Sequence, residues 1–297
     1  MRVVAADFIH PEDAAAMEQL QSVPMFDGFT RAFLKLYPEP LFRSQLLSQA
    51  IRLGPRQLPE IHAHLVDCCG VLELDVPEMF LQSSGAVNAY SMGDTDRFVV
   101  VTSELVEACE PDELRAVIAH EVGHLVCRHT LYKTMTRLLM QVGTGVFGPL
   151  AAAAVPIQVA LTYWSRRSEL SADRAAAVVL GGPGPVVETM IRLAGGPRAV
   201  TGGVDLGEYL RQADDFEAMG DDTWDRLIQL VAVMDADHPF NAVRAREIMR
   251  WCETDAYARL AAAVRQRREA PRCPECGRSV EAGWRFCFHC GTALADA

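Results

Sequence analysis

The sequence lacks the excess of basic residues that binding to nucleic acids requires. Its 28 Lys and Arg residues face 39 Asp and Glu residues, which leaves a net charge of −11 over 297 residues. The sequence-independent part of nucleic-acid affinity comes from a basic face, so we expect no nucleic-acid partner. The chain also has no internal repeat, and repeat architectures are therefore not expected.

The N-terminus lacks the apolar run of a secretory signal. Residues 1–20 instead carry Asp7, His10, Glu12 and Asp13, so no signal peptide is expected. The cysteines number nine, an odd count, and five of them are scattered in apolar helical contexts, where a thiol behaves as a small hydrophobic side chain. These five are Cys68, Cys69, Cys109, Cys127 and Cys252. The pattern indicates a reducing compartment, so we expect a cytoplasmic protein that could face the inner surface of the membrane.

The most informative motif is His120-Glu121-Val122-Gly123-His124, which lies in a stretch predicted to be helical from its apolar spacing. Positions four apart share one face of a helix, so the two imidazoles can be directed at one zinc ion. Glu121 would then lie beside the metal, where a base can take a proton from a bound water. The alternative is a chance spacing on an ordinary amphipathic helix.

A catalytic zinc needs a third protein ligand on a second element. Our choice is Glu169, in an alanine-rich helical stretch where Asp173 follows it on the same face. Asp173 could then accept the far N–H of a ligand histidine and fix its tautomer. The alternative for this pair is a solvated acidic face with Arg166 and Arg174 as neighbours.

Four ordered motifs over about residues 55–265 resemble the M48 metallopeptidases, the group of HtpX-type and Ste24-type enzymes. They are the two motifs above, His238-Pro239 followed by Arg244, and Asn88-Ala89-Tyr90. The resemblance implies an α+β, mainly helical, gluzincin-type domain with an active-site helix. It also implies Glu169 as third zinc ligand, Asp173 as its orienting residue, and a cleft lined by His238 and Arg244.

Physical chemistry gives these last two residues plausible roles. Peptide hydrolysis builds negative charge on the carbonyl oxygen, and a cation or imidazole placed there stabilises the transition state. Arg244 and His238 could both act in this way. His238 could instead be a fourth zinc ligand, and a His-Pro pair before a helix can also be a simple capping turn.

Three short segments before the first zinc helix are rich in β-forming residues: 79–82, 87–91 and 98–102. They predict a small antiparallel sheet. An edge strand of this sheet could pair with an extended peptide, with Asn88, Ala89 and Tyr90 binding the substrate. The alternative is a purely structural hairpin.

Residues 138–165 form a run of 28 residues without a formal charge. A single membrane crossing would separate His120 and His124 from Glu169, and two crossings need about 40 apolar residues. The run therefore predicts a helical hairpin, broken around residues 143–149 and again near Pro156. This hairpin could be buried in the protein or could make a peripheral contact with a membrane.

The C-terminus carries a second metal motif. Two Cys-x-x-Cys-Gly segments offer four thiolates, from Cys273, Cys276, Cys287 and Cys290, to one structural zinc. They resemble a short zinc ribbon, which has too small a core to fold without metal. Iron in place of zinc, a redox dithiol pair and two disulfides are the alternatives.

The domain organisation follows from these motifs. We expect a helical N-terminal region at 1–59, with its clearer helices at 14–20 and 41–53, packed on a peptidase domain at 60–265. A linker at 266–272 and a zinc ribbon at 273–297 complete the chain, and the ribbon could bind a protein partner.

The predicted function is zinc-dependent endopeptidase activity on peptides or proteins, with Glu121 as general base and two Zn²⁺ ions, one catalytic and one structural. One alternative is a peptide-binding scaffold or adaptor that cleaves poorly. The other is a membrane-associated quality-control protease.

Overall fold

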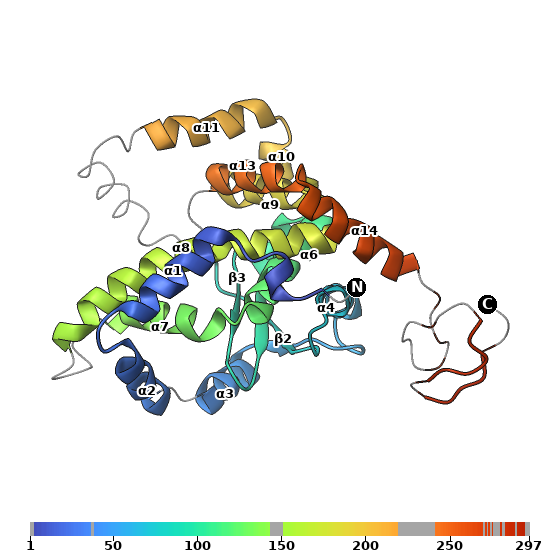
Figure 1. Cartoon of the computed structure of the whole chain (residues 1–297), viewed down its shortest axis with the longest axis horizontal. Coiled ribbons are helices and arrows are strands. Elements are labelled where there is room, and N and C mark those ends of the chain that lie inside the picture. The colour runs from blue at the N-terminus through green and yellow to red at the C-terminus, as the bar shows by residue number, and fades with distance from the viewer. Residues whose placement is uncertain are drawn as a thin grey trace.

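The structure, a computed structural model, describes residues 3–36, 39–142, 151–218 and 241–269. Of the C-terminal segment it describes residues 271, 273, 275, 280, 283–288 and 290–294. His238 and Cys276, both predicted as site residues, lie outside the described residues. Most of the described chain is helical and surrounds one small sheet (Figure 1).

The N-terminal region begins with a short 3-10 turn, Ala5–Asp7, and three helices follow it: α1 Pro11–Ser22, α2 Phe26–Leu36 and α3 Glu39–Gln49. Helix α1 has Pro11 at its first position, and the side chain of His10 caps it by accepting from the Glu12 backbone N–H. The predicted helices at 14–20 and 41–53 correspond to α1 and α3. The second was drawn too long, because residues 51–52 pair with the sheet as strand β1.

The sheet has four strands in the order β1-β2-β4-β3, with bounds Ile51–Arg52, Glu78–Gln82, Phe98–Thr102 and Ala89–Met92. All five residues of β4 are buried, as expected for a central, valine-rich strand. The expected antiparallel sheet is wrong for one pair, since β2 and β4 run parallel. The reason is that β3 occupies the far side of β4, so β2 pairs with β4 and not with its successor in sequence. This order leaves β3 at an edge.

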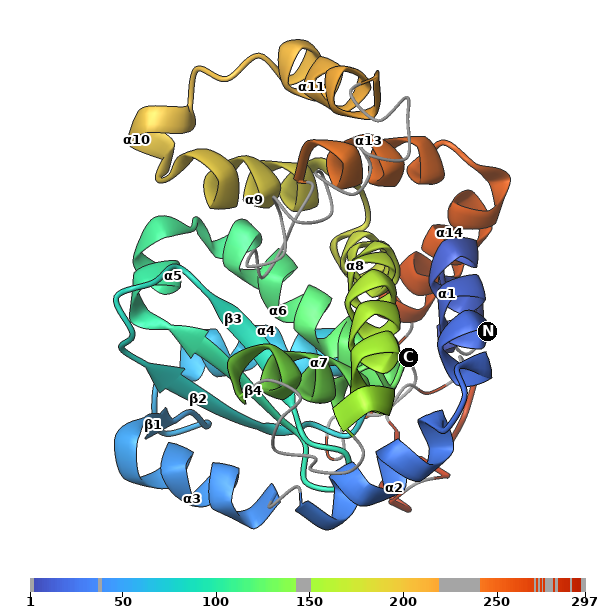
Figure 2. The same ribbon diagram turned by 90° about the vertical axis from the view of Figure 1, so that its left-hand side faces the viewer.

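Helices α4 Pro59–Leu72, α5 Ser103–Ala108 and α6 Pro111–Val126 build the layer next to the sheet. The predicted start of α6 is confirmed by a capping box in which the backbone N–H of Glu110 donates to Glu113 at 2.9 Å. Helix α6 lies between the sheet and the long helix α8, Ala151–Leu180 (Figure 2). It is buried from Leu114 through Leu125 at all but one position.

The crossing of α6 and α8 is unusually close at Gly123. A Cβ atom placed on this glycine would lie only 2.7 Å from the Cβ of Ala175 and 3.2 Å from the Cα of Ala172. Only a residue without a side chain lets the two backbones approach this far. The crossing brings the motifs of the two helices, 120–124 and 169–173, face to face.

Helix α7, Thr130–Val142, packs against α8, so the two helices form the arms of the predicted hairpin. The second predicted break is wrong, because α8 continues through Pro156 for 30 residues. Pro156 stands in the second turn of α8, where its missing N–H removes a single hydrogen bond. Among the described residues, no helix is long and apolar enough to cross a membrane.

The remaining helices are α9 Gly184–Gly195, α10 Arg198–Thr201, α11 Leu206–Ala218, α13 Asn241–Cys252 and α14 Asp255–Glu269. Helices α9 and α13 pack against α8 near its C-terminal half (Figure 2). The predicted linker at 266–272 starts later than expected, because residues 266–269 belong to α14. Arg268 anchors this end by donating to the carbonyl oxygen of Val179 at 2.9 Å.

Candidate metal centre

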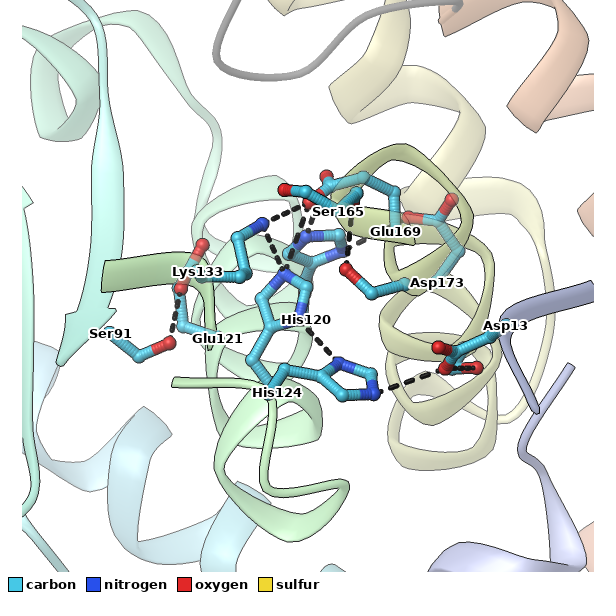
Figure 3. Close-up of polar contacts among 12 residues, drawn as sticks. Asp13, Ser91, His120, Glu121, His124, Lys133, Ser165, Glu169 and Asp173 are labelled. Carbon is cyan, nitrogen blue, oxygen red and sulfur yellow. Dashed lines mark hydrogen bonds and ion pairs between the residues drawn. The ribbon is translucent and has the colours of Figure 1, made fainter. Parts of the chain in front are cut away.

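Two imidazoles and one carboxylate meet at the crossing of α6 and α8. The Nε2 atoms of His120 and His124 each lie 3.3 Å from a different carboxylate oxygen of Glu169. Ligands about 2.0–2.1 Å from a tetrahedral zinc ion lie roughly 3.3 Å from one another, so the spacing fits zinc. All three side chains are buried, and they turn toward a common point (Figure 3). The donor set is therefore suited to a divalent metal ion.

Glu121 is buried beside this cluster and does not join it. Its Oε2 accepts a hydrogen bond of 2.8 Å from the hydroxyl of Ser91, on the edge strand β3 (Figure 3). The bond fixes one oxygen of the carboxylate and leaves the other for a proton transfer. The sequence did not single out Ser91, although it directly follows the predicted substrate-binding segment 88–90.

Asp173 and Arg244 support the cluster from the side of His120. Asp173 Oδ1 lies 3.0 Å from His120 Nδ1, a position from which it could fix the tautomer of this ring. Arg244, from α13, donates to both oxygens of Asp173 at 2.8 and 2.7 Å, and its third nitrogen lies 3.3 Å from Glu169 Oε2. Burial alone would raise the pKa of Asp173, but the Arg244 charge and hydrogen bonds outweigh it and lower that pKa.

The two histidines have pKa values shifted in opposite directions. Burial lowers the pKa of His120, but hydrogen bonds to Asp173 and Glu169 and the charges of both carboxylates outweigh it and raise that pKa to about 9. The pKa of His124 is lowered well below its usual value, first by burial and then by the ammonium of Lys133. The carboxylates thus favour positive charge at the side of His120.

Lys133 was not predicted as part of the site. Its ammonium comes from α7, contacts Glu169 Oε1 and lies 3.1 Å from His124 Nε2 (Figure 3). These two atoms are also the ones that would bind a metal ion. Since two cations repel at such a distance, the Lys133 side chain must turn away when a divalent ion binds.

A small pocket lies beside the cluster. Its polar wall contains His120, Glu121, Asp173 and Arg244, which agrees with the expectation that Arg244 lines the cleft. Its apolar wall comes from α6 and α9 and consists of Ala116, Val117, Val186, Met190 and Leu193.

The segment 88–90 lies close to the site, but its hydrogen bonds are made to other residues of the sheet. The backbone N–H of Asn88 donates to the hydroxyl oxygen of Thr102, and the Asn88 carbonyl oxygen accepts from the Thr102 backbone N–H, both at 3.0 Å. The hydroxyl of Tyr90 donates to Gln82 at 3.1 Å. The Ser91 side chain, on the opposite face of β3 from Tyr90, reaches Glu121. In the described sheet, the outer backbone edge of β3 pairs with no strand.

The C-terminal cysteines form the second cluster. The sulfur atoms of Cys273, Cys287 and Cys290 lie within 4.8 Å of one another, with 3.6 Å between Cys273 and Cys290. Thiolates about 2.3 Å from a tetrahedral zinc lie roughly 3.8 Å apart, whereas a disulfide needs about 2.05 Å. Gly291 takes the positive φ of 77° that the tight turn of such a knuckle requires. The geometry fits a metal site and not a disulfide.

Comparison with known proteins adds a family context. The sequence model of peptidase family M48 matches residues 55–252, two thirds of the chain, and a zinc-ribbon domain matches residues 271–294. No solved structure gives a significant match.

Three curated relatives illustrate the similarity. The chain is 30% identical over 260 residues to the plastoglobule-localized metallopeptidase 48 of Arabidopsis thaliana, covering 86% of this chain and 75% of the relative. It is 26% identical over 197 residues to a protease HtpX homolog of Moorella thermoacetica, covering 57% and 64%. It is 26% identical over 237 residues to a protease HtpX homolog of Bordetella avium, covering 66% and 78%.

Proposed function

Because the chain belongs to peptidase family M48, we propose that it is a zinc-dependent endopeptidase in which His120, His124 and Glu169 hold the catalytic ion. The observation that carries this proposal is the 3.3 Å spacing of each imidazole nitrogen from its own oxygen of Glu169. Asp173 and Arg244 keep His120 and Glu169 in place. A zinc ion bound here would supply a Lewis acid and a water acidic enough to lose its proton near neutral pH.

Glu121 is the general base in this mechanism. Ser91 holds its Oε2, so Oε1 accepts the proton from the attacking water. The same oxygen then returns the proton to the leaving amine nitrogen. The water oxygen forms a bond to the carbonyl carbon and the carbon–nitrogen bond breaks. The products are an amine and a carboxylic acid, which then loses its proton to solvent. No redox partner is needed.

The substrate would lie as an extended peptide along the outer edge of β3. This edge offers backbone N–H and C=O groups next to Ser91 and Glu121, which supports backbone pairing with the residues on either side of the scissile bond. Arg244 and His238 would then stabilise the negative charge that develops on the carbonyl oxygen. Alternatively, His238 could bind the catalytic zinc ion as a fourth ligand.

The C-terminal ribbon would hold a second, structural zinc through Cys273, Cys276, Cys287 and Cys290. Phe286 and Phe288, in the ribbon, are exposed. Exposed aromatic side chains of this kind are common in protein interfaces, which supports a role of the ribbon in recruiting a protein partner.

The chain would work in the cytoplasm with a peripheral contact to a membrane. Val155, Val159 and Tyr163 stand four residues apart on the N-terminal half of α8 and are exposed, so they form an apolar stripe on one face. The Arabidopsis relative is named after plastoglobules, and two others are HtpX homologs. Release from membranes by an alkaline wash without detergent would support a peripheral contact, and a need for detergent would favour the membrane-associated quality-control protease.

The competing function is a peptide-binding adaptor that cleaves poorly. The ordered Glu121 carboxylate favours the enzyme, because an adaptor has no need of a base beside the metal. Metal analysis of the wild-type chain, His124→Ala and Cys276→Ala tests both sites: we expect two zinc ions per chain and one in each variant. A wild-type protein that binds zinc yet cleaves no peptide from a diverse library would favour the adaptor.

A further inference from the structure

His124, the second proposed metal ligand, is supported by its own series of buried, hydrogen-bonded side chains, called the hydrogen-bond chain below. His124 Nδ1 lies 3.0 Å from Nδ1 of His129, which stands just before α7. His129 Nε2 lies 3.0 Å from Oδ2 of Asp13, on helix α1. All three side chains are buried, with exposed fractions of 2% or less. This series of hydrogen-bonded side chains thus runs from the N-terminal helix to the metal centre through the interior of the protein.

Asp13 is surrounded by hydrogen-bond donors. Trp164 Nε1 donates to its Oδ1 at 2.9 Å, and the Ser171 hydroxyl donates to its Oδ2 at 2.5 Å. The backbone N–H of His10 donates in turn to the Ser171 oxygen, so the serine proton is directed at Asp13. Burial raises the pKa of Asp13, but the hydrogen bonds from His129, Ser171 and Trp164 outweigh it and lower that pKa. Asp13 is therefore a carboxylate that only accepts.

This acceptor fixes a proton on Nε2 of His129, and with His129 neutral it also fixes the direction of the bond to His124. Because Asp13 only accepts, His129 must carry a proton on Nε2 to bond to it. A neutral His129 then has a bare Nδ1, which accepts from Nδ1–H of His124. His124 is left with a bare Nε2 that points at Glu169 and the metal position. This is the tautomer in which an imidazole binds zinc.

We propose that Asp13 and His129 are positioning residues that hold His124 in its metal-binding tautomer and orientation. The inference rests on the proposed metal site and extends its support from His120, which Asp173 contacts, to the other ligand histidine. It assigns a function to α1, which lies before the stretch that matches the peptidase family, residues 55–252. The N-terminal helix is then part of the metal centre and not a cover for it.

Histidine tautomers in the zinc-loaded, full-length wild-type protein test the proposal without any substitution. Long-range ¹H–¹⁵N NMR of histidine-labelled protein distinguishes a protonated from a bare ring nitrogen. We expect the proton of His129 on Nε2 and the proton of His124 on Nδ1. A His129 protonated on Nδ1, or on both nitrogens, would overturn the proposal.

Two substitutions test its energetic consequence. Asp13→Asn and His129→Phe should each weaken zinc binding about tenfold to a hundredfold, the range typical for lost support of a ligand histidine. Because both act through the same hydrogen-bond chain, the double variant should lose no more than the larger single loss. Cobalt-loaded protein provides a spectroscopic check, since a misaligned His124 changes the visible ligand-field bands.

A matched control separates positioning from simple destabilisation. Glu113→Gln also removes a buried carboxylate from an ion pair, with Arg192 at 3.0 Å, but it contacts no ligand of the metal. We expect it to lower stability and to leave zinc affinity within about twofold, as expected for independent sites. Equal losses of zinc affinity in this control and in the two supporting variants would contradict the proposal.

The zinc affinities of these variants also distinguish an error in the proposed metal site from an error in the positioning role. If His124→Ala binds as much zinc as the wild type, the metal site itself is wrong. If His124→Ala loses zinc while Asp13→Asn and His129→Phe keep the wild-type affinity, the metal site stands and the positioning role alone is refuted. The wild-type spectrum answers the tautomer question even if a variant does not fold.

Discussion

The two candidate metal sites of this chain are built in opposite ways. At the crossing of α6 and α8, the ligands are buried in the main core and each is held by further side chains. In the ribbon, a small cluster of Cys273, Val280 and Cys287 is backed by the partly buried Trp284 and Leu294. The packing of the main fold positions the ligands of the first site. The ribbon buries too little apolar surface to hold its cysteines in place without a metal ion. In our proposal, a metal ion at the first site takes part in catalysis, and a metal ion at the second stabilises the fold of the ribbon.

The largest expected effect separates chemistry from metal binding at the first site. Glu121→Gln should lower kcat by about a hundredfold to ten-thousandfold, because the amide cannot take a proton from water. Zinc content should stay at the wild-type value, since Glu121 is not among the ligands. Peptide cleavage assays and metal analysis of the same preparation measure both. Full activity in this variant would show that another group is the base.

The next prediction concerns the ribbon. Cys287→Ala removes a buried ligand of the second cluster, so the ribbon should lose its zinc and unfold, while the main unfolding transition shifts by no more than about 2 °C. Limited proteolysis and calorimetry of the full chain detect the two events separately. His124→Ala is the mirror control and should leave the ribbon resistant to protease. A large shift of the main transition in Cys287→Ala would show that the two parts stabilise each other.

A smaller effect should appear with pH and involve α1. Burial, and then the charge of Arg174, lower the pKa of His10 to about 4. Folding therefore favours the neutral ring, and the unfolded chain binds more protons between about pH 6.5 and pH 4. Stability present above pH 6.5 should fall by about 3 kcal/mol through this window.

His10→Asn is the matched variant, because asparagine can cap α1 and does not titrate. Urea denaturation at pH 7.5 and pH 4.5 should show a smaller loss in this variant than in the wild type. Equal losses would place the acid sensitivity elsewhere in the molecule.

The smallest expected effect is an increase in affinity. Lys133→Met removes an ammonium that contacts the metal-binding atoms of Glu169 and His124, so zinc should bind about tenfold more tightly, or 1.4 kcal/mol. Competition with a chromophoric chelator measures the difference. Lys133→Arg keeps the charge and should stay near the wild-type affinity. A weaker affinity in Lys133→Met would mean that the ammonium supports the site.

Much of the candidate metal site could be predicted from the spacing of residues along the sequence. His120 and His124 could be placed on one helical face from sequence, and Glu169 with Asp173 on another, since both pairs depend only on the period of the helix. The start of α6 was predictable because proline and acidic residues mark a helix start. The mainly helical fold with a small sheet and the family membership are confirmed as well.

What sequence could not reveal depends on contacts between distant segments. Ser91 reaches Glu121, and Asp13 reaches His129, only after the elements pack, and no local pattern marks either partner. The parallel pairing of β2 with β4 has the same cause, because strand order is decided by the tertiary fold. Pro156 was interpreted as a break from its local effect, but one lost hydrogen bond is small beside the buried length of α8.

The close helix crossing at Gly123 limits which metal ligands could be placed at this centre. Because the two backbones nearly touch there, the reach from α8 to the histidines is matched to the length of a glutamate. A bulkier residue at 123 would act as a wedge and move the carboxylate out of bonding range. A redesign of this centre for another metal would therefore begin with the width of the crossing, before any ligand is exchanged.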